Sequence, residues 1–415
     1  MDDLDVRKQL AREILSWGLQ ESDFAMTPEP APAAPAAVVA EAAAAKLNID
    51  WPQGLAPLPK PIDPPPGPND ALPKCDVVVI TWTVDELDAL CDVLTPGFDR
   101  NKWYRYARNF AQTYSNLIRD GAPAKAAKRL GSYMPTQIGD LNVLCMKSEL
   151  HLNQDGKTEP PGAPGNATLP VKNFFEQIIA ETGAKHIITT GTAGGVYTEQ
   201  DLGDVVVTRA AQFRVQSEFK SAPFAGKTYK DDWKVPKKHF KKAEQFMAKF
   251  KNNLDPAYVP CFPPTAYYKP NDQTLVPVSS RQPVPAIWLD GAEVPKLGAG
   301  KKMPKFHPIL TTDFFEFGTS TNGLEKHGSA VEMGDAVLGL VVQELKDAGK
   351  PAPNWVVVRN CSDPQINGLL PAGPPSKISQ QALWAVFYYK GYGYWTTVNS
   401  AITCWAIIAG INDEA

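Results

Sequence analysis

Apolar runs of strand length alternate with stretches of helical period between residues 75 and 411. Short apolar runs, most of them rich in β-branched residues, predict buried strands at 75–81, 141–146, 186–190, 205–207 and 355–359. Helical spacing of apolar residues predicts helices at 82–90, 169–180, 236–253, 330–345 and 383–411. This alternation predicts an α/β layered sheet rather than a β-sandwich or a helix bundle.

The stretch 186–207 organises the rest of the chain. Its first apolar run leads into residues 191–195, where three glycines accompany Thr192 and Ala193. The pattern predicts a tight turn at which backbone amides and the Thr192 hydroxyl face a small molecule. A glycine cluster alone fits a tight turn without a ligand equally well.

Three further segments differ in composition from this α/β part. Residues 1–25 contain an amphipathic pattern that predicts a short helix, and the Pro- and Ala-rich segment 26–74 predicts a linker or a strap across the surface. The domain therefore spans 75–415, with an irregular insertion at about 212–305. The insertion contains the predicted helix at 236–253, which is rich in lysine. Its charges form either a solvated face or a positive rim that attracts a phosphorylated substrate.

Composition excludes several classes of function. The 415 residues are 43% apolar and 21% charged, with a formal net charge of -3, so no overall charge favours nucleic acid or an anionic membrane. No apolar run has the length of a membrane span, and the acidic start lacks the pattern of a signal peptide. Six scattered cysteines without a CxxC pair and five scattered histidines predict a reduced, cytoplasmic protein without a structural metal.

Polar residues follow the ends of three predicted strands. Glu86 follows the first strand, Thr192 the central one, and Arg359 and Asp363 the last. Ligands of open α/β sheets bind beyond the carboxyl ends of the strands, and buried carboxylates and arginines there are costly unless they are paired or used. Each residue alone is explained by a helix cap or a salt bridge, whereas together they predict a site.

Four segments of this sequence, in their order, resemble the nucleoside phosphorylase and nucleosidase superfamily. They are Thr190-Gly191-Thr192-Ala193-Gly194-Gly195, Gly203-Asp204-Val205-Val206-Val207, Val331-Glu332-Met333 and Val357-Val358-Arg359-Asn360-Cys361-Ser362-Asp363. The resemblance covers about 75–411. It implies a three-layer αβα sandwich around a central mixed, partly barrel-like sheet.

Within that superfamily, the sequence is most similar to hydrolases of the methylthioadenosine/S-adenosylhomocysteine nucleosidase type. Residues 80–90 match their first strand and acidic helix start, and the Gly-Asp-Pro-x-Arg phosphate loop of the phosphorylases is lacking. The resemblance implies hydrolysis of the N-glycosidic bond of a purine nucleoside or nucleotide, without a metal or an organic cofactor. Two alternatives stay open, namely a phosphorylase that uses inorganic phosphate and a catalytically weak nucleoside-binding module. Dimers or hexamers are usual in the family, so we expect a homo-oligomer.

The resemblance also implies the catalytic roles. Asp363 is expected to share a proton with the purine N7, which relieves the negative charge of the departing base. Ser362 orients that carboxyl group. Glu86 is expected to polarise water, with Arg359 and Thr192 holding it.

A wider substrate-binding set follows from the same motifs. Phe315 matches the residue that stacks on the base, and Met333 would pack under the ribose. The other members are Thr192, Ala193, Gly194, Asp313, Glu332, Asp335 and Ser362.

One position departs from the family pattern. Family members usually read Glu-Met-Glu, and the second Glu binds the ribose 2′- and 3′-hydroxyls. This chain has Gly334 in its place, followed by Asp335. Either Asp335 turns toward the sugar or the sugar is held differently, and the glycine is the feature that favours the binding-module alternative.

Overall fold

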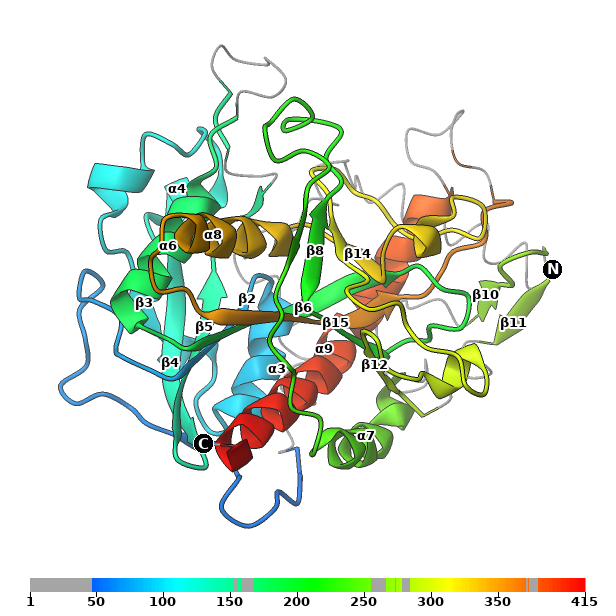
Figure 1. Ribbon diagram of the computed structural model, residues 1–415, viewed down its shortest axis with the longest axis horizontal. Coiled ribbons are helices and arrows are strands. Elements are labelled where there is room, and N and C mark those ends of the chain that lie inside the picture. Colours follow the sequence, from blue (N-terminus) through cyan, green and yellow to red (C-terminus); the bar gives the residue numbers. More distant parts are fainter. Residues whose placement is uncertain are drawn as a thin grey trace.

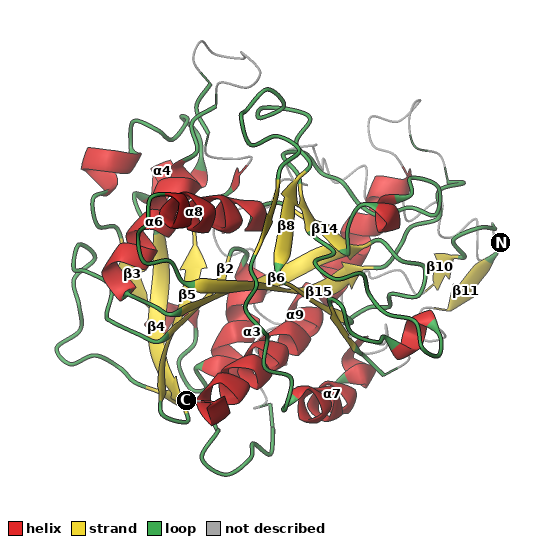
Figure 2. Cartoon of the chain, in the orientation of Figure 1, coloured by secondary structure: helices red, strands yellow, loops and turns green. Residues whose placement is uncertain are grey.

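A computed structural model describes residues 47–414, except 153–155, 159–166, 255–265, 273, 278–283, 371 and 373–379. The helix predicted within residues 1–25, and the first part of the linker, lie outside the described residues. Strands and helices alternate along the rest of the chain (Figures 1 and 2).

The strands are β1 (Leu58–Pro59), β2 (Val77–Thr81), β3 (Tyr104–Tyr106), β4 (Gly131–Ile138), β5 (Leu141–Ser148), β6 (His186–Gly195), β7 (Val205–Thr208), β8 (Ala210–Phe213), β9 (Thr228–Lys230), β10 (Ala266–Tyr268), β11 (Leu275–Pro277), β12 (Ile287–Leu289), β13 (Ile309–Thr311), β14 (Ala330–Glu332) and β15 (Asn354–Asp363). The α-helices are α3 (Val84–Leu94), α4 (Pro123–Ala127), α6 (Pro170–Thr182), α7 (Phe240–Lys249), α8 (Asp335–Asp347) and α9 (Gln380–Glu414). All described strands except the β10–β11 hairpin join one mixed sheet.

Helices cover both faces of this sheet. Successive side chains of a strand point to opposite faces, and in β2 Val78 and Ile80 pack with α6 and α8, whereas Val77 and Val79 pack with α3 and α9. Figure 1 shows α6 and α8 on one side of β6 and β15, and α3, α7 and α9 on the other. The predicted fold class, a layered α/β domain with a central mixed sheet, is confirmed.

The long helix α9 is buried along most of its C-terminal half. Each of residues 396–409 is at most 1% exposed, because the sheet, α3, α7 and the segment before β1 enclose them. Trp51 of that segment stacks on Trp405 at 4.6 Å between ring centroids, and the Trp405 indole donates to the Leu55 carbonyl. Residues 47–59 are therefore a strap over α9. Within the described part of the chain, no helix has the length and apolarity to cross a membrane.

The sheet forks at β6. One edge of β6 carries β15 along its whole length, in parallel. The other edge pairs first with β2, up to Ile80 opposite Thr189, and then with β14, at Gly194 and Gly195. Between these pairings the Thr192 amide donates to the Glu86 carboxylate rather than to a strand.

Two sequence predictions are wrong in this region. Residues 191–195 continue β6 as a strand instead of forming a tight turn. Its glycines leave room for neighbouring side chains, among them the carboxylates of Glu86 and Asp363. Residues 330–332 form β14 rather than the start of a helix, which begins at Asp335 after the extended Gly334. The segment 212–305 also contains β9 and β12, which pair with β8 and β7 of the main sheet.

Candidate active site

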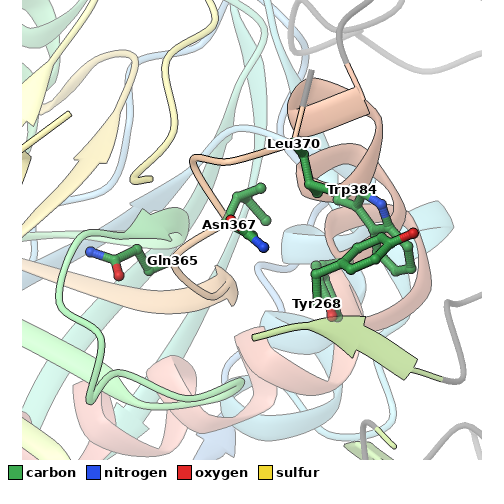
Figure 3. Close-up of a pocket in the computed structure, with 7 residues that line it drawn as sticks. Tyr268, Gln365, Asn367, Leu370 and Trp384 are labelled. Carbon is green, nitrogen blue, oxygen red and sulfur yellow. The ribbon is translucent and has the colours of Figure 1, made fainter. Parts of the chain in front are cut away.

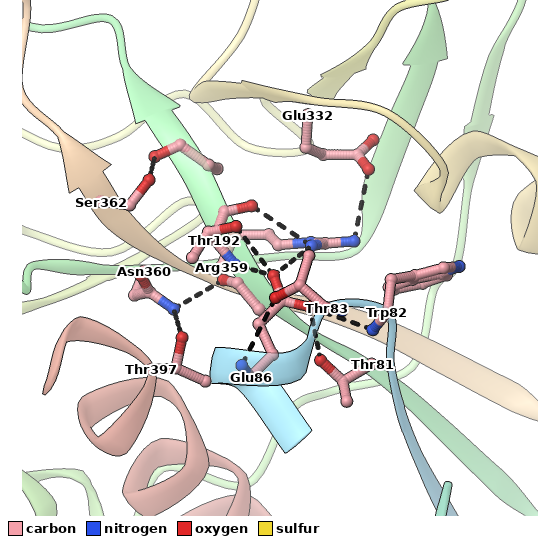
Figure 4. Close-up of polar contacts among 12 residues, drawn as sticks. Thr81, Trp82, Thr83, Glu86, Thr192, Glu332, Arg359, Asn360, Ser362 and Thr397 are labelled. Atoms are coloured by element: carbon pink, nitrogen blue, oxygen red, sulfur yellow. Dashed lines mark hydrogen bonds and ion pairs between the residues drawn. The ribbon is translucent and has the colours of Figure 1, made fainter. Parts of the chain in front are cut away.

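The carboxyl ends of three parallel strands meet at the fork in the sheet. The register places Arg359 of β15 opposite Gly191, and Asp363 opposite Gly194. Glu86 reaches the same place from the first turn of α3, directly after β2. The structure thus brings together Glu86, Thr192, Arg359 and Asp363, as the positions of the strand ends predict. Figure 4 shows the first three of them.

Glu86 is fully buried and surrounded by donors. Its Oε2 accepts from the Thr81 hydroxyl and from the amides of Trp82 and Thr83, at 2.7 to 3.0 Å. Its Oε1 accepts from the Thr192 amide at 2.7 Å and the Thr192 hydroxyl at 2.8 Å. Burial raises the pKa of Glu86, but the Arg359 charge and these hydrogen bonds outweigh burial, so its pKa is lowered and the group is ionised.

Glu86 also has a structural role. With Thr83 as the N-cap it completes a capping box at the start of α3, which satisfies donors at the helix end. The local sequence therefore fixes the carboxylate at the sheet edge whether or not a substrate is present.

Asp363 lies in the opposite electrostatic situation. Its Oδ1 accepts from the Ser362 hydroxyl at 2.8 Å, and the side chain lies against Gly194 of β6. Burial raises the pKa of Asp363 to about 7, against the opposing effect of the Ser362 hydrogen bond. Near neutral pH a large fraction of Asp363 therefore carries a proton, while Glu86 does not.

Arg359 binds mainly to Asp335. Its guanidinium donates to the two Asp335 oxygens at 2.8 and 2.7 Å, and also to Glu332 at 3.3 Å and to the Thr192 carbonyl at 3.2 Å. Its nearest approach to a Glu86 oxygen is 3.9 Å. Asp335, one candidate for sugar contact, is thus fully buried with both oxygens bonded to Arg359.

Glu332 and Met333 lie at the more accessible side of this cluster, 6% and 8% exposed. Burial and the nearby Asp335 charge raise the pKa of Glu332 to about 8. The Trp82 ring lies beside Gly334, at 3.6 Å from the position of an added Cβ, and 4.8 Å from the Arg359 guanidinium. An indole therefore lies where the family pattern leads us to expect a sugar-binding carboxylate.

Phe315 and Asp313, two further predicted binding residues, differ in what they contact. Phe315 is half-buried and packs against Phe317, with ring centroids 5.5 Å apart. Asp313 instead accepts four hydrogen bonds from backbone amides at residues 216–219, so it anchors that loop. Both of its oxygens are used in doing so.

Two aromatic residues of the site were not predicted. The backbone of Phe317 comes within 3.6 Å of an added Cβ at Gly194, which places it close to Asp363. Tyr389 of α9 bonds to Thr83 and interacts electrostatically with Glu86 and Asp363. A second phenylalanine two residues after Phe315 was a usable signal for Phe317, whereas nothing local in the sequence points to Tyr389.

A narrow pocket adjoins the site without containing its charged residues. It is lined mainly by aromatic and apolar side chains from β10, α9 and the segment after β15 (Figure 3). Its lining residues are Tyr268, Gln365, Ile366, Asn367, Leu370, Trp384 and Tyr388. Gln365 follows Asp363 by two residues, so one lining residue is close to the candidate acid along the chain, but none of the candidate catalytic residues lines the pocket.

Two lysines of the predicted 236–253 helix pair with acidic residues outside the site. Lys238, just before α7, pairs with Asp413 at the end of α9, and Lys249 of α7 pairs with Asp50 of the strap. These contacts favour the solvated-face interpretation over a positive rim for substrate.

Comparisons with known proteins found matches among solved structures alone. No family model matches the sequence, and a search of curated proteins found no match. The matching structures include a futalosine hydrolase of Helicobacter pylori (11% identity, 82% of this chain and 97% of that chain, TM-score 0.40). They also include a 5′-methylthioadenosine/S-adenosylhomocysteine nucleosidase of Neisseria meningitidis in complex with methylthio-immucillin-A (14% identity, 80% and 98%, TM-score 0.39). A variant of the H. pylori nucleosidase with 5′-methylthioadenosine in its active site matches as well (12% identity, 82% and 99%, TM-score 0.41).

Proposed function

We propose that this protein is a nucleosidase that hydrolyses the N-glycosidic bond of a purine nucleoside or nucleotide to free base and sugar. The observation that carries the proposal is the pair Glu86 and Asp363. Two carboxyl groups at one sheet edge have pKa values shifted in opposite directions, which supports Glu86 as the base and Asp363 as the acid.

Asp363 supplies the acid. Cleavage of the bond leaves negative charge on the departing purine, and a proton shared with N7 removes it. Ser362 holds one Asp363 oxygen, which leaves the other to face the base. The phenylalanine pair Phe315 and Phe317 supplies aromatic surface for the purine ring.

Glu86 supplies the ionised group that orients water. Its five donors include the Thr192 hydroxyl. Thr192 as a residue is 7% exposed, whereas Thr81 is fully buried. Rotation of the Thr192 hydroxyl lets a water molecule take its place on Oε1. The ionised Glu86 places a negative charge near the positive, oxocarbenium-like sugar and its attacking water.

The test is release of free base, detected by chromatography, from methylthioadenosine, S-adenosylhomocysteine, adenosine, inosine, AMP and ATP, with and without phosphate. The wild type is compared with Glu86→Gln and Asp363→Asn. We expect release without phosphate, reduced in both variants by about 10²-fold or more.

Release only with phosphate would instead identify a phosphorylase. No release from the whole panel, with the protein folded, would reject the nucleosidase for these substrates and favour a binding module, as Gly334 suggests.

A further inference from the structure

Asp335 makes the shortest ion pair of the site, yet it does not face the substrate side. It is the first residue of α8 and is completely buried. Its two oxygens accept hydrogen bonds from the Arg359 guanidinium at 2.7 and 2.8 Å. This bidentate geometry is among the strongest ion-pair arrangements. The guanidinium lies 3.9 Å from the nearest Glu86 oxygen.

Three carboxyl groups surround this single guanidinium. Glu332 receives one hydrogen bond from Arg359 at 3.3 Å, and Glu86 receives none within hydrogen-bond distance. Glu332 in turn accepts from the Asp335 amide, so the start of α8 holds both residues. The remaining partners of Glu86 are neutral donors.

This difference changes what Glu86 can do. A carboxylate in a bidentate pair with arginine has its charge neutralised and both oxygens used, so it is a poor acceptor for the proton of a water molecule. A carboxylate held by neutral donors keeps its charge, and one donor hydroxyl can turn away.

We propose that Asp335 is a positioning residue for the reaction: it draws Arg359 away from Glu86 and so keeps the Glu86 carboxylate available to water. The inference rests on the proposed function for its catalytic consequence, but the position of Arg359 can be tested independently. It replaces the expectation that Asp335 binds the sugar.

A purely structural role for Asp335 is the competing explanation. An acidic residue in the first turn of a helix stabilises the helix dipole, and loss of any buried ion pair destabilises a protein. The chain offers a matched control in Arg209 and Asp290, whose bidentate pair has distances of 3.1 and 2.9 Å and shares no residue with the site.

The experiment compares Asp335→Asn with Asp290→Asn by crystallography and by steady-state base release. In Asp335→Asn we expect the Arg359 guanidinium to move to hydrogen-bond distance from Glu86. We also expect kcat to fall at least about tenfold, a loss of 1.36 kcal/mol of transition-state stabilisation, with KM changed little. Asp290→Asn should leave both unchanged.

Asp335→Glu keeps the charge and serves if the asparagine variant does not fold. Its longer side chain should push the guanidinium toward Glu86 and lower kcat in the same way. An Arg359 position unchanged from the wild type in the folded variants would overturn the proposal, as would equal losses in Asp335→Asn and Asp290→Asn. If the wild type releases no base, the proposed function fails, while the position of Arg359 in the variants still decides whether Asp335 holds it away from Glu86.

Discussion

Gly191 and Gly194 lie on β6 where the two candidate catalytic carboxylates approach the strand. A Cβ at Gly191 would come within 2.4 Å of a Glu86 oxygen, and a Cβ at Gly194 within 2.9 Å of an Asp363 oxygen. Gly191 also has a φ of 143°, which favours glycine. Each glycine therefore makes room for one carboxylate.

Replacement of Gly191 should disturb the site and the fold together. We expect Gly191→Ala to lower the free energy of unfolding by about 1–3 kcal/mol, because the methyl group displaces a buried, hydrogen-bonded carboxylate. Gly334→Ala is the control, since its Cβ meets nothing closer than 3.6 Å and its φ of -173° suits any residue. It should cost less than about 1 kcal/mol. Equal losses in denaturant unfolding would contradict this account of Gly191.

The acid form of Asp363 predicts a pH profile. Because the proposed acid must be protonated and its pKa is raised to about 7, kcat/KM should fall as pH rises through about 7. Glu86, with its pKa lowered, stays ionised throughout that range. A p-nitrophenyl riboside is the control, because its leaving group needs no proton. If kcat/KM for that substrate falls in the same way with rising pH, the pH dependence does not come from Asp363 acting as the acid.

Helix α9 is tied to the site by a buried polar group. The Asn360 amide nitrogen of β15 lies within 2.8 to 3.1 Å of the Gly191 carbonyl and of the Thr397 and Ser400 hydroxyls. Figure 4 shows Asn360 between β15 and the helix that carries Thr397. This contact fixes the helix against the strand that carries Arg359 and Asp363.

Loss of the Asn360 contact should destabilise the fold. We expect Asn360→Leu to lower the free energy of unfolding by about 1–3 kcal/mol, because it leaves buried hydrogen-bonding groups without a partner. The exposed Asn142 of β5 is the control, and Asn142→Leu should change stability by less than about 0.5 kcal/mol. Thermal unfolding of both variants measures the difference, and comparable values would show that the Asn360 contact contributes little.

Whether a segment is a strand or a helix was largely predictable from periodicity, but where the elements begin and end was not. Strands β2, β6 and β15 have strong β-branched runs, β5 has an apolar run, and the apolar spacing of α6 and α9 predicted both helices within a few residues. β4 was missed because Pro135 interrupts its pattern. β6 was cut short at Gly191, since a glycine cluster ordinarily marks a turn and nothing local reveals that distant carboxylates fill its space.

The candidate site shows the same limit. The polar residues Glu86, Thr192, Arg359 and Asp363 were predicted to lie at one edge of the sheet. They follow the ends of predicted strands, and the ends of parallel strands lie together. The pairing of Arg359 with Asp335 depends on the exact start of α8, which periodicity does not determine. Tyr389 joins the site through the packing of α9, far away in the sequence.

The strap extends the core of the whole molecule. Trp51 packs on Trp405 and on Phe246, joining α9 and α7 beneath the sheet. We expect Trp51→Ala to lower the free energy of unfolding by about 2 kcal/mol. Leu58→Ala, at a side chain that is 55% exposed, should change it by less than about 0.5 kcal/mol. Indistinguishable unfolding curves for the two variants would mean that the strap does not stabilise the domain.

The central claim is that water, oriented at Glu86, attacks the sugar while Asp363 protonates the base. The most direct measurement is mass spectrometry of the sugar product after phosphate-free reaction in water enriched in oxygen-18. The account predicts free base together with a sugar that carries one oxygen-18 atom at its anomeric carbon, and loss of both products in Asp363→Asn. A sugar without the label, or cleavage that requires phosphate and yields a sugar phosphate, would contradict it.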